Sequence, residues 1–137
     1  ENCEFNYIKL NGDILEYNIA SEVEFNSYND FEISCLIPTS IRNPEVKLLI
    51  LNQDLMVISA SQSIPNEIIN DGVELKIKLN LGPFILKPGP YKISLNVSTE
   101  GMKRQLIYFE SWWPINVKGE NDFGSNFIVF DNKWEQL

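Results

Sequence analysis

The chain contains no histidine. This absence removes the most common general base, the pairs in which histidine activates a serine or cysteine, and the most common zinc ligand. The glycines never fall at the spacing of a phosphate-binding loop or a dinucleotide-binding turn. Aspartate and glutamate lie mostly in turns and at outward strand positions, which is typical of a solvated surface rather than of a two-carboxylate glycosidase. We therefore expect no catalytic residue, no metal site, no cofactor and no enzymatic activity.

Long apolar runs are also absent, since no run approaches the roughly 20 residues that span a bilayer. The polar opening "ENCEF" is not a signal peptide. Eleven basic residues face 19 acidic ones, which gives a net charge of −8 that repels phosphate backbones and anionic lipid. We therefore expect no nucleic-acid partner, and a ligand that is neutral or is selected by shape and hydrogen bonds.

Cysteine is scarce, because Cys3 and Cys35 are the only two. Cys35 lies in the strand-like run "FEISCLI", where an inward thiol acts as a small hydrophobic side chain. Cys3 lies near the terminus, where we expect fraying. We expect both to be reduced and structural, although pairing in an oxidising compartment stays open.

Alternation with a period of two dominates the sequence and predicts half-buried antiparallel strands. Three runs alternate apolar and polar residues: "FEISCLI" (31–37), "VELKIKLNL" (73–81) and "YKISLNVS" (91–98). Short turn signals such as "NDG" (70–72) and "KPGP" (87–90) separate the runs. We therefore expect an all-β antiparallel sandwich over residues 1–137 as a single domain. Because the chain starts without Met, we expect it to be part of a longer protein.

Two adjacent tryptophans, Trp112 and Trp113, occupy the late run "ESWWPINVKG". Alternation places Trp113 in the core with Ile115 and Val117, and places Trp112 on the opposite face with Asn116. A bulge before Pro114 would change this assignment. Trp112 then either packs under a loop or against another chain, or stacks on a ligand.

The neighbours of Trp112 favour a sugar as that ligand. Sugar rings carry an apolar C–H face rimmed with hydroxyls, which an exposed aromatic ring and nearby hydrogen-bonding side chains match. The candidate carbohydrate-binding residues are Trp112, Tyr108, Asn116, Lys92, Ser94 and Asn96. The sequence does not show whether their strands are neighbours.

The order of several segments resembles one known domain. The segments are "FEISCLI", "NPEVKLLILNQD", "GVELKIKLNLGPFILKPGPYKISLNV", "FESWWPINVKG" and the closing "NKWE". They are similar to the C-terminal carbohydrate-binding domain of Wzt-type proteins, the ATP-binding subunits of bacterial O-antigen polysaccharide ABC transporters. The most telling pieces are "LKPGPYKISLNV" and the closing aromatic strand with Trp134.

This resemblance implies that the antiparallel sandwich is immunoglobulin-like. It also implies recognition of a lipid-linked O-polysaccharide for export, without catalysis, by a domain attached to an upstream nucleotide-binding domain. It implies a cytoplasmic location at the inner membrane, beside the membrane subunit of the transporter. It also implies a homodimer with exchange of the last strand, and we expect the segment Phe127–Phe130 to pair with the partner chain. Two alternatives stay open: a structural immunoglobulin-like interaction domain of a surface or secreted protein, and an accessory domain of a glycan-active enzyme.

Overall fold

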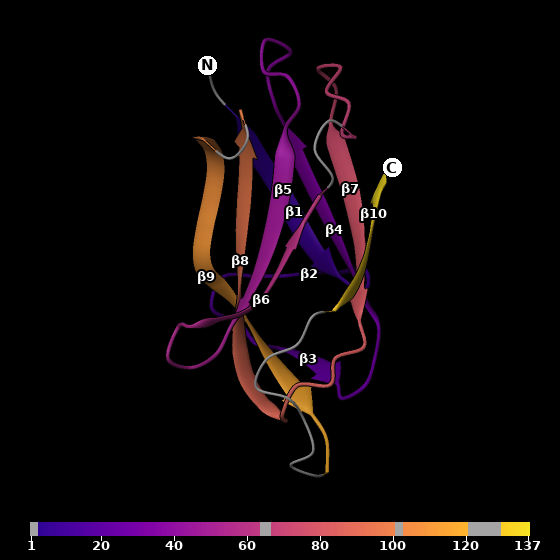
Figure 1. Ribbon diagram of the computed structural model, residues 1–137, viewed down its shortest axis with the longest axis vertical. Coiled ribbons are helices and arrows are strands. Elements are labelled where there is room, and N and C mark those ends of the chain that lie inside the picture. The colour runs from indigo at the N-terminus through magenta and orange to yellow at the C-terminus, as the bar shows by residue number, and fades with distance from the viewer. Residues whose placement is uncertain (1–2, 64–66, 101–102, 121–129) are drawn as a thin grey trace.

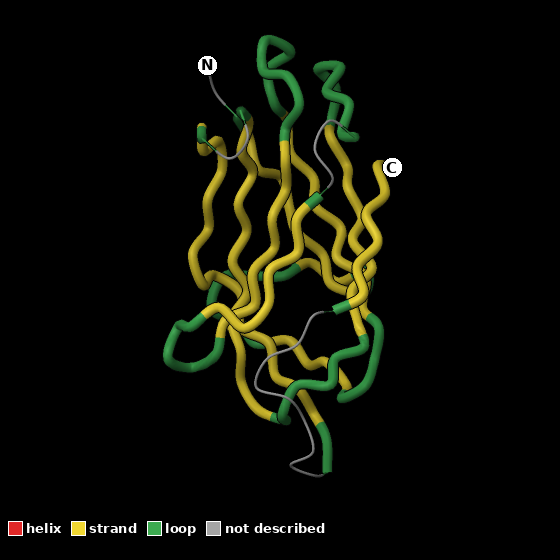
Figure 2. Tube along the Cα trace, in the orientation of Figure 1, coloured by secondary structure: helices red, strands yellow, loops and turns green. Residues whose placement is uncertain are grey.

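A computed structural model describes residues 3–63, 67–100, 103–120 and 130–137 of the chain. Over these residues the chain forms strands, turns and loops (Figure 2). No helix long and apolar enough to cross a membrane occurs in this part of the chain. The fold is an all-β, immunoglobulin-like sandwich of two sheets (Figure 1). The alternating sequence predicts the sandwich, and the family resemblance implies its immunoglobulin-like form.

The two sheets have five strands each. In spatial order, the first sheet contains β10 (Asp131–Gln136), β7 (Leu75–Gly82), β4 (Asn29–Leu36), β1 (Glu4–Leu10) and β2 (Asp13–Ile14). The second sheet contains β3 (Ser21–Glu24), β9 (Arg104–Lys118), β8 (Gly89–Thr99), β5 (Glu45–Leu51) and β6 (Val57–Gln62). All neighbouring pairs are antiparallel except β3 and β9, which run parallel from Ser21↔Ile115 to Glu24↔Lys118. The predicted antiparallel sandwich is confirmed, with this one parallel pair as the exception.

The core lies between the inward faces of both sheets, where alternation correctly predicts the buried side chains. Phe31, Ile33, Cys35 and Ile37 are all 0% exposed. Val73 is an exception at 64% exposure, because β7 begins only at Leu75.

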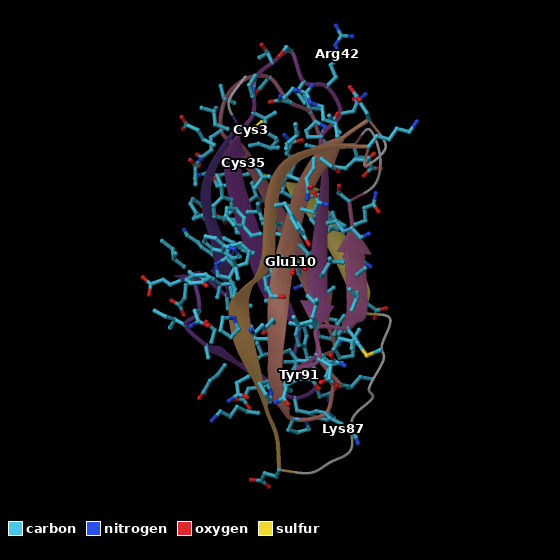
Figure 3. The ribbon with its side chains drawn as sticks, turned by 90° about the vertical axis from the view of Figure 1, so that its left-hand side faces the viewer. Cys3, Cys35, Arg42, Lys87, Tyr91 and Glu110 are labelled. Carbon is cyan, nitrogen blue, oxygen red and sulfur yellow. The ribbon has the colours of Figure 1, made fainter. Side chains whose placement is uncertain are left out.

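Both cysteines are thiols, and they lie near the same end of the molecule (Figure 3). Burial, with smaller contributions from Cys3 and Glu74, raises the pKa of the Cys35 thiol to about 12, so it stays protonated at neutral pH. Cys3 is half-buried and packs against the core. The expectation of a frayed position for Cys3 is therefore wrong, since β1 begins one residue later.

Candidate carbohydrate-binding face

Several charged and polar groups on the outward face of the first sheet pair with one another. The Tyr7 hydroxyl donates a hydrogen bond of 2.6 Å to the Glu32 carboxylate, and this bond is the main cause that raises the pKa of Tyr7 to about 12. Asp30 accepts a hydrogen bond of 2.7 Å from the Asn80 amide and lies 3.5 Å from the Lys78 ammonium. Such mutual pairing is typical of a solvated face that needs no ligand.

The outward face of the second sheet carries a transverse line of polar side chains on four adjacent strands. Cross-strand register aligns Gln62 with Lys47, Lys47 with Asn96, and Asn96 with Tyr108. We call these four residues the polar row. Residues directly opposite each other in a sheet lie close enough for their side chains to touch the same ligand. The structure therefore brings two of the predicted site residues, Asn96 and Tyr108, onto neighbouring positions.

Two polar atoms on β8 and β9 are buried and have no hydrogen-bond partner among the described residues. They are Asn96 Oδ1 and Ser111 Oγ. A buried acceptor without a partner costs free energy, on the order of 1–3 kcal/mol. Tyr108, beside Asn96, is 44% exposed and offers both a ring face and a hydroxyl. Burial, then the nearby Glu110 carboxylate, raises the pKa of Tyr108, which keeps this hydroxyl protonated.

A bulge in β9 explains why Ser94 is not available to a ligand. Register passes from Ile93↔Trp113 to Leu95↔Phe109, so Glu110, Ser111 and Trp112 all lie opposite Ser94. Ser111 takes the left-handed conformation, with φ of 55°. Its N–H donates a hydrogen bond of 2.7 Å to Ser94 Oγ, and Ser94 is only 1% exposed. Ser94 therefore holds the bulge in place, and its predicted contact with a ligand does not fit the structure.

The same bulge overturns the expected position of Trp112. Its ring makes edge contacts with Phe109 and Tyr17, each with centroids 4.6 Å apart, and lies 6.2 Å from the Trp113 ring. Phe5, Tyr17, Phe109, Trp112 and Trp113 form one aromatic cluster along the side of the sandwich where β1 and β9 lie. The two tryptophans thus do not point to opposite faces, because the extra residues break the alternation. Trp112 keeps 38% of its surface exposed, next to Tyr17.

The remaining predicted residues lie further along the face of the second sheet. Lys92 is opposite Pro114, and Asn116 is opposite Pro90. Both side chains are half-buried. They share the face of the polar row but lie nearer the other end of β8, so a ligand contacting all of them must extend along the strands.

Sequence reasoning missed Lys47 and Gln62. The run "EVKLLIL" reads as apolar on both faces, and it is the pairing of β5 with β8 that places Lys47 beside Asn96. The arrangement can bind a hydroxylated ligand through hydrogen bonds and an exposed ring. Across the part of the chain that the structure describes, no three His, Cys, Asp or Glu side chains lie close enough together to hold a metal ion.

Comparison with solved structures supports this fold. The chain is similar to the C-terminal domain of Wzt, with a TM-score of 0.70, 16% identity, and coverage of 89% of this chain and 77% of that domain. It is also similar to a Niemann-Pick type C2 protein from the Japanese carpenter ant, with a TM-score of 0.59, 13% identity, and coverage of 86% and 94%. No protein-family model matches the chain, and no curated protein matches it.

Proposed function

We propose that this chain is a non-catalytic carbohydrate-recognition domain that binds an O-antigen polysaccharide for export by an attached ABC transporter. The observation that carries the proposal is the unpartnered, buried Asn96 Oδ1 between Lys47 and the exposed Tyr108 ring. A sugar hydroxyl donates to this acceptor once the half-buried Asn96 amide turns outward, while the C–H face of the sugar packs on the ring. Similarity in fold to the C-terminal domain of Wzt supports the same assignment.

The proposal includes the setting in which the domain works. A nucleotide-binding domain precedes it in the same protein, and the membrane subunit of the transporter holds both at the cytoplasmic face of the inner membrane. Two copies form a homodimer by exchanging β10, which pairs with β7 of its own chain in the structure. Most of the predicted pairing segment Phe127–Phe130 lies outside the described residues; Phe130 itself is buried in the core.

Removing the side chain of Asn96 or Tyr108 from the polar row is expected to weaken glycan binding while the fold persists. Asn96→Ala removes the unpaired acceptor, and Tyr108→Ala removes a binding-site aromatic whose loss costs about 2 kcal/mol, or about thirtyfold in affinity. Binding is measured on an array of bacterial O-polysaccharides, followed by titration calorimetry with the glycan that binds. Asn132→Ala on β10 and Tyr28→Ala before β4 are matched controls on other parts of the surface. Unchanged binding by both polar-row variants contradicts the proposal.

One observation favours a protein-interaction domain as the second candidate. Leu55, Met56 and Val57, at the turn into β6, are 54%, 54% and 48% exposed. Three consecutive exposed apolar residues are typical of a surface that contacts another protein. If no O-polysaccharide binds the intact domain, this candidate replaces the first.

A further inference from the structure

A cavity of about 320 Å³ lies at the end of the sandwich, beyond the polar row. The loop before β5 and the ends of β8 and β9 form it, and Figure 3 shows Arg42 at this end of the molecule. Its charged lining residues are Arg42, Glu45, Glu100 and Arg104. The volume is at the lower end of the range for ligand sites, about 300–1,000 Å³.

Every arginine of the chain lines this cavity. Arg42 and Arg104 are the only two, and both line it although they are far apart in the sequence. Neither guanidinium has an ion pair with a carboxylate of residues 3–63, 67–100, 103–120 or 130–137; the ion pairs there all use lysines. Within those ranges both arginines are thus without an ion pair, although the carboxylates of Glu45 and Glu100 line the same cavity. Arginine is the side chain best suited to a planar, two-point contact with a carboxylate or phosphate.

Glu45 adds a second chemical requirement. It is only 6% exposed, and its Oε2 accepts a long hydrogen bond of 3.4 Å from the Gln62 amide. A carboxylate that is nearly buried without a cation needs hydrogen-bond donors. A bare anion does not supply donors, whereas a hydroxylated ligand does.

Register connects the cavity to the polar row. Glu45 lies opposite Ser98, and two residues further along β5 Lys47 lies opposite Asn96. Gln62 belongs to the polar row and also donates to Glu45. A polysaccharide with one sugar on the polar row can therefore place its next sugar in the cavity.

We propose that this cavity binds an acidic sugar, with its carboxylate or phosphate on Arg42 and Arg104 and its hydroxyls donating to Glu45. The inference rests on the proposed function, because the sugar is taken to be one unit of the recognised glycan. It refines the expectation from net charge: the protein as a whole is acidic, but the lining of this cavity balances two arginines against Glu45 and Glu100.

The test uses the intact chain with glucuronate, glucose 6-phosphate, glucose and inorganic phosphate as separate probes, followed by NMR titration. We expect both acidic sugars to shift the NMR resonances of residues around the cavity, and glucose to shift them much less. Whichever acidic sugar binds more tightly shows whether the site prefers a carboxylate or a phosphate. Arg42→Gln and Arg104→Gln should each weaken binding of the acidic sugars at least about tenfold, since hydrogen bonds to charged groups contribute about 1.5–3 kcal/mol. Lys133→Gln on β10 removes the same charge elsewhere and should change nothing.

Glu45→Gln separates a sugar site from a simple anion site. It should weaken the acidic sugars, which lose an acceptor for their hydroxyls, and strengthen inorganic phosphate, which loses a repelling charge. Thermal melts confirm that each variant is folded. The inference is overturned if Lys133→Gln weakens binding of the acidic sugars as much as the arginine variants do. It is also overturned if neither acidic sugar shifts the resonances of residues around the cavity. Binding of a neutral O-polysaccharide that depends on Asn96 but not on the arginines overturns this inference alone, whereas loss of all glycan binding to the unmodified chain overturns the proposed function.

Discussion

Trp113→Ala is expected to destabilise the fold by about 3–5 kcal/mol, the usual cost of removing a buried tryptophan from a core. Trp113 is 2% exposed, lies opposite Ile93, and has ring contacts with Phe5 at 5.9 Å and Phe109 at 5.4 Å. Since domains have only about 5–15 kcal/mol of stability, the variant should unfold early in urea or at modest temperature. Circular dichroism during thermal and urea denaturation measures the effect.

Trp112→Ala is the matched control within the same aromatic cluster. Its ring is 38% exposed and contacts Phe109 and Tyr17, so its removal should cost about 1 kcal/mol, the scale of an aromatic pair. That is more than the negligible loss expected of an isolated outward ring and far less than the loss at Trp113. If the two variants have the same melting temperature, the assignment of Trp113 to the core and Trp112 to the edge is wrong. If Trp112→Ala also binds O-polysaccharide normally, the predicted role of this ring in binding is wrong.

Ending the chain at Gly119 is expected to remove most of the stability of the domain. The truncation deletes β10, which pairs with β7 from Asp131↔Gly82 to Gln136↔Ile77. It also deletes Phe130, whose ring stacks on the fully buried Phe84 with centroids 4.7 Å apart. The loss of Phe130 alone should cost about 3–5 kcal/mol.

A synthetic peptide of residues 120–137, added in trans, should restore cooperative unfolding to the shortened chain, because it supplies the same strand and the same ring. Such rescue is the two-chain arrangement that strand exchange requires. Light scattering should then give the intact domain the mass of two chains at tens of micromolar. Wild-type melting of the shortened chain contradicts the structural role of β10. A single-chain mass of the intact domain contradicts the exchange.

Alternation identified the core because burial on one face of a strand is a local property. The period of two in "FEISCLI" specifies Phe31, Ile33 and Cys35 as inward wherever the strand lies in the sheet. The same rule failed at Trp112, since three residues of β9 lie opposite Ser94 and turn this ring toward the aromatic cluster. Trp113, just beyond the bulge, keeps the buried position that alternation predicts. Alternation also gave no warning that β3 pairs parallel with β9.

The candidate site was predictable only in part, because strand neighbours are decided by contacts distant in sequence. Asn96 was found through its position on the polar face of an alternating strand, and Tyr108 as a second aromatic residue. Lys47 and the two arginines were not found, because nothing within "EVKLLIL" or "IRNP" indicates which strand ends lie beside them.

The bulge in β9 allows tryptophan fluorescence to report ligand binding. The Ser111 N–H donates a hydrogen bond to Ser94, two residues before Asn96 of the polar row. The next residue, Trp112, belongs to the aromatic cluster and contacts Phe109. A ligand that moves Ser111 therefore changes the surroundings of Trp112 and Trp113, two of the three tryptophans of the chain. The wavelength and yield of tryptophan emission should follow occupancy of the polar row, so binding at this face is measurable without a label.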